Sequence, residues 1–223
     1  DLYAFDSRFT GKSSAFKVTY EGKTYQFETR LAGRFNIYNT LGAIGAALSE
    51  GISMETIAAA MKTFHSVPGR FELIDEGQSF TVVVDYAHTP DGLEKILTTA
   101  QEITKGRILV VFGCGGDRDK MKRPIMGRIA ARYADVAIVT SDNPRTEDPE
   151  TIVKEVAAGV EEVKAEKLSL QVEVVVDRRS AIQKAISLAK GDDIVLIAGK
   201  GHEDYQILKD KTIHFDDREE ARK

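Results

Sequence analysis

The stretch Phe80–Ile103, FTVVVDYAHTPDGLEKILTTAQEI, decides the fold class. It begins with the apolar, β-branched run 80–87, which is typical of a strand buried on both faces. A helix is predicted over 89–103, because Thr89 can cap it and Pro90 suits its first position. The apolar stripe of this helix consists of Leu93, Ile96, Leu97 and Ala100. A buried strand that leads directly into an amphipathic helix indicates an α/β unit.

The same alternation continues along the chain. Further apolar strands are predicted over 107–113, 135–140, 171–176 and 193–199, and helices over 123–134, 149–165 and 178–190. With the first pair this makes five strands and four helices, which implies an α/β, Rossmann-like, mostly parallel sheet with helices on both faces. The tail 205–215 reads as a hairpin.

The first seventy residues have a different pattern. Apolar and polar residues alternate around Glu21-Gly22-Lys23, which predicts a β-hairpin. Two helices follow, one over 36–51 and a shorter one after Ser53. Pro68-Gly69 then interrupts the pattern as a turn or hinge, so we predict a domain boundary there, between residues 1–70 and 71–223.

Composition excludes several classes of protein. The 223 residues are 42% hydrophobic, enough to fill a core, and the formal net charge of −4 gives no sign of a nucleic-acid partner. One cysteine excludes a disulfide framework and fits the cytoplasm. No apolar run reaches the ~20 residues of a membrane span, and no signal peptide is seen. The chain begins at Asp1 without a methionine, so we expect a fragment of a longer protein.

Polar clusters follow all five predicted strands. They are DYAHTPD (85–91), GCGGDRD (113–119), SDNPR (141–145), DRR (177–179) and GKGHED (199–204). In parallel sheets, ligands bind beyond the carboxyl ends of the strands. A single cluster of this kind would be explained by the exposure of a strand end to solvent, but five clusters at one edge predict a binding site.

Each cluster taken alone has two interpretations. Asp85 and His88 either orient a nucleotide or phosphate, or merely end a strand and begin a helix. Gly113, Gly115 and Gly116 with the nearby cations either accept a phosphate or carboxylate, or form a solvated turn; these cations are Arg118, Lys122 and Arg123. Glu203 either holds an ammonium group or lies in a flexible loop.

Two sequences that look like phosphate-binding loops are not such loops. Gly11-Lys12-Ser13 and Gly22-Lys23-Thr24 lack the glycine that a P-loop places five residues before its second glycine, since Asp6 and Lys17 stand there. Neither segment can therefore cradle the β- and γ-phosphates of a nucleotide in the way a P-loop does.

Together the motifs resemble one family. The order GRFNIYN, PGRFE, DYAHTPD, GCGGDRD, SDNPRTEDP and AGKGHEDYQ resembles the Mur ligases of bacterial cell-wall synthesis, most strongly from Gly33 to Asp217. Within the family it is most similar to the branch that adds meso-2,6-diaminopimelate to UDP-N-acetylmuramoyl-L-alanyl-D-glutamate. The resemblance implies that residues 1–70 end a central ATP-binding domain and that residues 71–223 form the C-terminal amino-acid-binding domain.

The resemblance also implies a chemistry. ATP phosphorylates a carboxylate of the UDP-N-acetylmuramoyl dipeptide, and an amine attacks the acyl phosphate. Mg²⁺ takes part, with ligands mostly outside this chain, so no metal ligand is assigned here. The implied ATP-binding residues are Asn36, Asn39, Arg70 and Asp85, and the implied catalytic residues are Arg70, Asp85 and His88. A cytoplasmic monomer without a nucleic-acid or membrane partner is expected.

In the branch that this sequence resembles, the motif Asp142-Asn143-Pro144-Arg145 binds the incoming amino acid. Diaminopimelate carries two ammonium and two carboxylate groups. A guanidinium can grip a carboxylate with two hydrogen bonds, so Arg145 is implied to bind the distal carboxylate. The implied substrate-binding residues are Arg118, Asp142, Asn143, Pro144, Arg145, Gly199 and Glu203.

Other functions stay open at this point. The motif could be a plain turn built on an aspartate or asparagine side chain. The protein could be a related ligase, either the Mur-type ligase that adds the D-alanyl-D-alanine dipeptide or the relative that makes folylpolyglutamate. It could also be a module that binds an amino acid or nucleotide without chemistry.

Overall fold

The computed structural model describes residues 2–10 and 13–223. The chain divides into two compact units, one ending at Val67 and one spanning Pro68–Lys223. Each has its own hydrophobic core, and each is described by itself.

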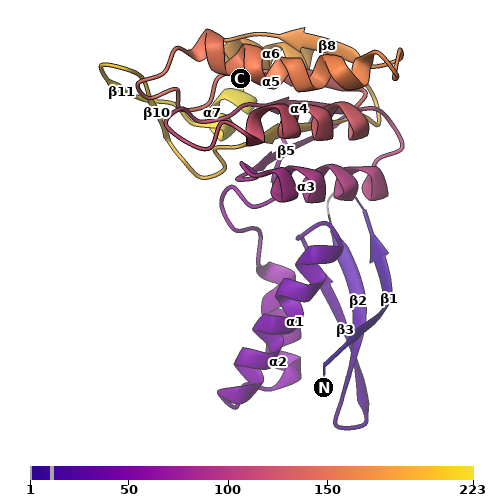
Figure 1. Cartoon of the computed structure of the whole chain (residues 1–223). Coiled ribbons are helices and arrows are strands. Elements are labelled where there is room, and N and C mark those ends of the chain that lie inside the picture. The colour runs from indigo at the N-terminus through magenta and orange to yellow at the C-terminus, as the bar shows by residue number, and fades with distance from the viewer. Residues whose placement is uncertain (1, 11–12) are drawn as a thin grey trace. The chain divides into compact units, whose positions relative to one another are not determined.

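The N-terminal unit is a three-stranded antiparallel sheet with two helices (Figure 1). Its elements are β1 (Ala4–Phe9), β2 (Ser14–Tyr20), β3 (Lys23–Thr29), α1 (Arg34–Ser49) and α2 (Met54–Thr63). Phe16 and Phe27 face each other across β2 and β3 and stack with ring centroids 5.4 Å apart. Both helices bury apolar side chains against this face, including Ile44 and Ile57. The predicted hairpin and helices are confirmed, whereas β1 was not predicted.

The C-terminal unit is built on a six-stranded sheet of order β4-β5-β9-β6-β7-β8. Its strands are β4 (Glu72–Ile74), β5 (Thr81–Asp85), β6 (Ile108–Phe112), β7 (Val136–Val139), β8 (Gln171–Val174) and β9 (Ile194–Ala198). All neighbours pair in parallel except the edge strand β4. The predicted α/β class with a mostly parallel sheet is therefore confirmed. The hairpin of β10 (Tyr205–Ile207) and β11 (Thr212–His214) is separate from this sheet.

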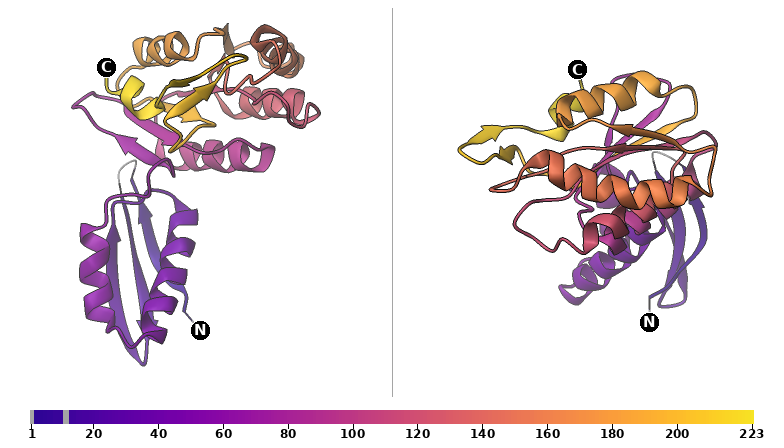
Figure 2. Two further views of the ribbon diagram at one scale, coloured as in Figure 1. Left: turned by 90° about the vertical axis from the view of Figure 1, so that its left-hand side faces the viewer. Right: turned by 45° about the horizontal axis from the view of Figure 1, so that its top comes forward.

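Helices cover both faces of this sheet. They are α3 (Pro90–Ile103), α4 (Lys122–Tyr133), α5 (Pro149–Lys164), α6 (Arg178–Leu188) and the short α7 (Asp217–Ala221). Parallel crossovers are right-handed. The connections from β5 to β8 run one way across the sheet and put α3, α4 and α5 side by side on one face (Figure 1). The return from β8 to β9 puts α6 on the other face, as the second views also show (Figure 2).

The predicted Thr89 cap is present, and α5 begins with a cap of the same kind. Thr89 Oγ1 accepts a hydrogen bond from Gly92 N at the start of α3, and Asp148 accepts one from Thr151 N at the start of α5. Each helix has a proline in its first turn, where no backbone donor is needed. Within the described residues, no helix combines the length and the apolar character that crossing a membrane requires.

Candidate functional site

The loops after β5, β6, β7 and β9 meet at one edge of the sheet, because these strands are neighbours that run in parallel. They enclose a pocket of about 290 Å³. Its wall consists of Tyr86, His88, Thr89, Gly115, Arg118, Asp119, Lys122, Asp142, Asn143, Arg145, Gly199 and Glu203. Polar clusters that lie up to about a hundred residues apart in the sequence thus form one cavity.

Most of the substrate-binding residues expected from the sequence line this pocket. The exception is Pro144, which is buried behind the wall and whose carbonyl accepts a hydrogen bond from Glu147 N. Of the expected catalytic residues, only His88 lines the pocket. Asn36 and Asn39 belong to α1 of the other unit.

The pocket wall carries charges of both signs. Arg118, Arg145 and Lys122 supply cations, and Asp119, Asp142 and Glu203 supply carboxylates. A phosphate site would require a cationic wall, since carboxylates repel phosphate oxygens. Interspersed charges suit a ligand that itself carries ammonium and carboxylate groups.

Arg145 is held on one side and open on the other. Its Nη1 donates to the carbonyl oxygens of Gly116 at 2.9 Å and Asn143 at 3.4 Å. Within the described residues Nε and Nη2 have no acceptor, and these two N–H groups form the fork that grips a carboxylate side-on. The backbone of Arg145 has φ of 52°, an uncommon conformation for a side-chain-bearing residue, fixed by a bond from its N–H to Ile207 O.

Space for this guanidinium comes from a glycine. A Cβ at Gly115 would lie 2.8 Å from Arg145 Nη1, so any larger residue would displace the arginine. A Cβ at Gly116 would lie 1.9 Å from Pro144 O, which shows how closely the loops after β6 and β7 pack. The glycine-rich cluster therefore serves loop packing and the placement of Arg145.

Asp142 offers a carboxylate to the pocket. The residue is 6% exposed, and no donor within the described residues reaches its side chain. Its Oδ2 lies over Gly199, 2.8 Å from where a Cβ would be, and Gly199 has φ of 123°. Gly199 thus makes room for the acid. A nearly buried carboxylate that no protein donor reaches can accept hydrogen bonds from a ligand, such as those of an ammonium group.

Asn143 is engaged by the protein itself. Its Oδ1 accepts hydrogen bonds from Ile207 N at 2.9 Å and from Lys200 Nζ at 3.2 Å, and its Nδ2 donates to Glu203 Oε2 at 3.0 Å. Both lone pairs of the amide oxygen are used. Asn143 therefore shapes the pocket wall, and a ligand ammonium would be left to Asp142 and Glu203.

The loop that carries Arg118 is tied to the residues directly after Arg145. Asp117 accepts hydrogen bonds from the N–H and the hydroxyl of Thr146, and Asp117 N donates to Glu147 Oε1. Arg123, grouped by sequence with the ligand-binding cations, is instead fully buried. It donates to Glu147 and Glu155 at 2.7–3.1 Å and is thus unavailable to a ligand.

Glu147 makes this anchoring dependent on pH. Hydrogen bonds from Arg123 above all, together with the one from Asp117 N, lower the pKa of Glu147 to about 2. The folded-state pKa is depressed, so the stability that this carboxylate contributes is full above about pH 4.5 and is lost as the pH falls toward about 2.

We expect Glu147→Gln to lower the free energy of unfolding at neutral pH and to reduce its decline on acidification from pH ~5 to pH ~3. Urea unfolding at several pH values measures both. Glu150→Gln, at an exposed position of the next helix, is the control and should follow the wild type. Parallel pH curves for wild type and Glu147→Gln would contradict this role for Glu147.

Asp85 and Arg70 lie beside the pocket. Asp85 is buried and accepts 2.7 Å hydrogen bonds from Phe71 N and Ala87 N. Burial raises the pKa of its carboxyl against the pull of these amides. Asp85 therefore ties the start of the C-terminal unit to the end of β5. The exposed Arg70 guanidinium lies over the ring of Tyr86, 5.0 Å from its centroid.

His88 and the two asparagines of α1 have local partners. The Nδ1 atom of His88 is 2.8 Å from Tyr86 O, and its ring lies 4.6 Å from the ring of Tyr86. Asn36 is buried and donates to Ala32 O at 2.8 Å, and the exposed Asn39 donates to Asn36 Oδ1 at 3.2 Å. Of these side chains, His88 and Asn39 are exposed and accessible to a ligand.

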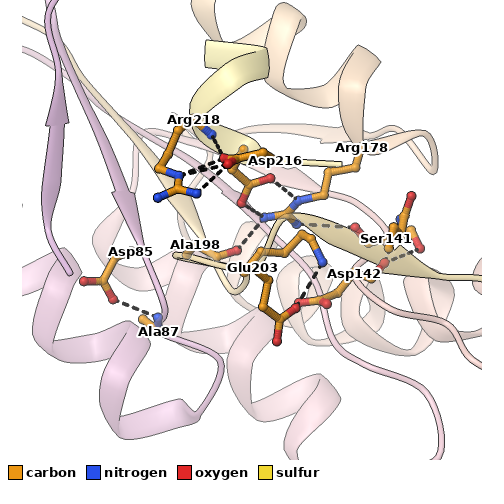
Figure 3. A network of polar contacts seen from close by, with 12 residues as sticks. Asp85, Ala87, Ser141, Asp142, Arg178, Ala198, Glu203, Asp216 and Arg218 are labelled. Carbon is orange, nitrogen blue, oxygen red and sulfur yellow. Dashed lines mark hydrogen bonds and ion pairs between the residues drawn. The ribbon is translucent and has the colours of Figure 1, made fainter. Parts of the chain in front are cut away.

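A buried ion pair lies behind the site, and no local pattern of residues predicts it. Arg178, which is 1% exposed, donates from Nε and Nη2 to the two oxygens of Asp217 at 2.8 and 2.7 Å. It also donates to Ser141 O and Ala198 O, the carbonyls just before Asp142 and Gly199 (Figure 3). One guanidinium thus joins the ends of β7 and β9 to the starts of α6 and α7.

Comparison with known proteins places the chain in a family. A family model described as Mur ligase, glutamate ligase domain, matches residues 69–201. The chain therefore belongs to the Mur ligase family.

Several similar proteins carry a more specific name. The UDP-N-acetylmuramoyl-L-alanyl-D-glutamate--2,6-diaminopimelate ligase of Clostridium botulinum is 51% identical over 221 residues, which are 98% of this chain and 44% of that protein. The ligase of the same name from Geobacillus kaustophilus is 50% identical, over 100% of this chain and 44% of that protein. A solved structure of such a ligase matches with a TM-score of 0.74 at 37% identity, covering 100% of this chain and 44% of that one. The chain spans less than half the length of the curated relatives it matches.

Proposed function

We propose that this chain is the amino-acid-binding part of an ATP-dependent ligase of peptidoglycan synthesis. The reaction joins meso-2,6-diaminopimelate to UDP-N-acetylmuramoyl-L-alanyl-D-glutamate through an acyl phosphate. The names of the relatives support both substrates. The observation that carries the assignment is Arg145, whose Nε and Nη2 groups are open in a pocket of mixed charge.

The pocket residues divide the ligand between them in this proposal. Arg145 binds the distal carboxylate, and the exposed Arg118 binds the other carboxylate. Asp142 and Glu203 accept hydrogen bonds from ammonium groups, while Gly199 leaves room for Asp142. Asn143 and Pro144 shape the loop. Because both ends of the amino acid are fixed, its amine is held in line with the carbonyl carbon of the acyl phosphate. The attack of the amine then becomes an effectively unimolecular step.

The nucleotide belongs at the side of Tyr86. Arg70 and His88, which both contact Tyr86, suit a phosphate, since they are exposed and can carry positive charge. Asp85 acts by holding the Phe71 backbone, and with it Arg70, in place. Asn39 on α1 is assigned to the adenine, and the buried Asn36, which accepts a hydrogen bond from Asn39, is assigned to holding it in place. ATP supplies the phosphoryl group that activates the carboxylate. Among the described residues, no three His, Cys, Asp or Glu side chains gather as metal ligands. Mg²⁺ is proposed to bind with ATP, through ligands that lie mostly outside this chain.

The domain assignment belongs to the same proposal. Residues 1–70 would end the central ATP-binding domain, and residues 71–223 would form the domain that brings in the amino acid. We further propose a cytoplasmic monomer, and we expect no turnover by this chain alone.

A panel of amino acids tests the proposed function. By isothermal titration calorimetry, the chain is expected to bind meso-2,6-diaminopimelate at least about 30-fold more tightly than L-lysine, which lacks one carboxylate and so leaves a charged partner unpaired. L-glutamate and D-alanyl-D-alanine test the related ligases. Equal binding of lysine, or tighter binding of glutamate or the dipeptide, would refute the assignment.

A further inference from the structure

Lys200 is a fully buried cation directly behind the pocket wall. Its side chain is 0% exposed, and it does not line the pocket. An ammonium removed from water costs several kcal/mol unless partners replace the lost hydration. A lysine at such a place therefore has to be explained by the groups that surround it.

The partners of Lys200 are two pocket residues and one ring. Nζ lies 3.1 Å from Glu203 Oε2 and 3.2 Å from Asn143 Oδ1. It also lies 5.4 Å from the centroid of the Tyr205 ring, a distance at which a cation is attracted to the ring face. Glu203 and Asn143 come from different loops, sixty residues apart, and Lys200 joins them.

These contacts fix the direction of each group. Because Lys200 and Ile207 N use the oxygen of Asn143, its amide nitrogen must face Glu203, and it donates to Glu203 Oε2 at 3.0 Å. Glu203 Oε2 therefore accepts from both Lys200 and Asn143, so that Oε1 is the oxygen that can turn to a ligand, although the Tyr205 hydroxyl also interacts with this carboxylate. Without the lysine, the carboxylate would lose the one salt bridge that it makes within the described residues and could turn toward water.

We propose that Lys200 is a positioning residue for amino-acid recognition, which holds Glu203 so that this carboxylate accepts one particular ammonium group of the ligand. This inference rests on the proposed function of the pocket. It predicts that the contribution of Lys200 is confined to ligands that carry the ammonium group in question.

The test compares ligands that differ by one ammonium group. Binding of meso-2,6-diaminopimelate and of the two enantiomers of 2-aminopimelate, each lacking one ammonium, is measured by calorimetry for the wild-type chain, Lys200→Met and Lys211→Met. A hydrogen bond to a charged group is worth about 10- to 100-fold in affinity, so Lys200→Met should weaken diaminopimelate binding by that factor. For the enantiomer that lacks the ammonium held by Glu203, the loss should stay below about threefold. In a full-length ligase that contains this chain, the Michaelis constant for diaminopimelate should rise while kcat changes little.

Controls separate positioning from general damage. Lys211, exposed in the β10–β11 turn, should tolerate methionine without loss of binding. The thermal midpoint of the free chain monitors folding. If Lys200→Met does not fold, Lys200→Gln retains hydrogen bonding without the charge and should show the same ligand dependence.

Each outcome has a distinct meaning. Equal losses for all three ligands would overturn the inference and make Lys200 a purely structural residue, and unchanged binding would also overturn it. Either result would leave the proposed function standing if the wild-type chain prefers diaminopimelate. A wild-type chain that binds none of these ligands would overturn both.

Discussion

Replacing Arg145 by alanine is expected to weaken binding of meso-2,6-diaminopimelate by roughly 30- to several-thousand-fold. The reason is the loss of a paired, charge-assisted contact, which leaves the carboxylate of the bound ligand without its partner at a cost of ~2–5 kcal/mol. Affinity for L-lysine should change little, because lysine has no second carboxylate to lose. Arg145→Lys should restore only part of the affinity, since an ammonium cannot form the two-pronged contact.

Calorimetric titration of wild type and both variants with the two amino acids measures these effects. Arg132→Ala is a suitable control, because Arg132 is an exposed arginine of the same unit outside the pocket wall. ATP affinity serves as an internal control and should not change. If Arg145→Ala impaired ATP binding but left diaminopimelate binding intact, the Asp142–Arg145 motif would be only a turn.

The largest loss of stability is expected from Arg178→Met. Both members of the Arg178–Asp217 pair have side chains that are 0% exposed, and their charges lie 2.7 Å apart. Removing one partner leaves a buried, uncompensated charge, which costs about 3–5 kcal/mol. It also leaves Ser141 O and Ala198 O without this donor. Urea unfolding of the C-terminal unit measures the change.

The neighbouring Arg179 supplies a matched control. Its side chain is 49% exposed and pairs with Glu220 at 3.1 Å, so Arg179→Met should cost no more than about 1 kcal/mol. Asp217→Asn should resemble Arg178→Met. If Arg178→Met were no more harmful than Arg179→Met, the buried pair could not be what holds the ends of β7 and β9 together.

The sequence was sufficient to predict elements whose pattern is local. Strands such as β6 and β9 are apolar at every position, and α3 and α5 carry a cap and a proline at their starts. The elements that were missed depend on distant partners. The strand β4 has three residues and exists as an antiparallel partner of β5, and α7 has five residues and is held by Arg178. The edge strand β1 has no buried residue, and three of its six residues are exposed.

The same distinction between local patterns and distant partners applies to the site. Residues that follow directly after apolar strands, such as Asp142 and Glu203, could be assigned to one edge from the sequence. The interactions behind the wall could not, because they join residues 57 positions apart in Lys200–Asn143 and 39 positions apart in Arg178–Asp217. One available signal was Lys200 itself, a charged residue between two glycines directly after a buried strand.

The position of β9 has a consequence for how the protein is made. This strand is the last of the sheet to leave the ribosome, yet it lies between β5 and β6, which are synthesised far earlier. Until Ala198 has emerged, these two strands have no partner between them, and their apolar edges stay exposed. Pairing over such distances along the chain is slow and leaves nascent chains prone to aggregation. The six-stranded sheet can therefore be completed only after β9 has been synthesised, later than all of its other strands.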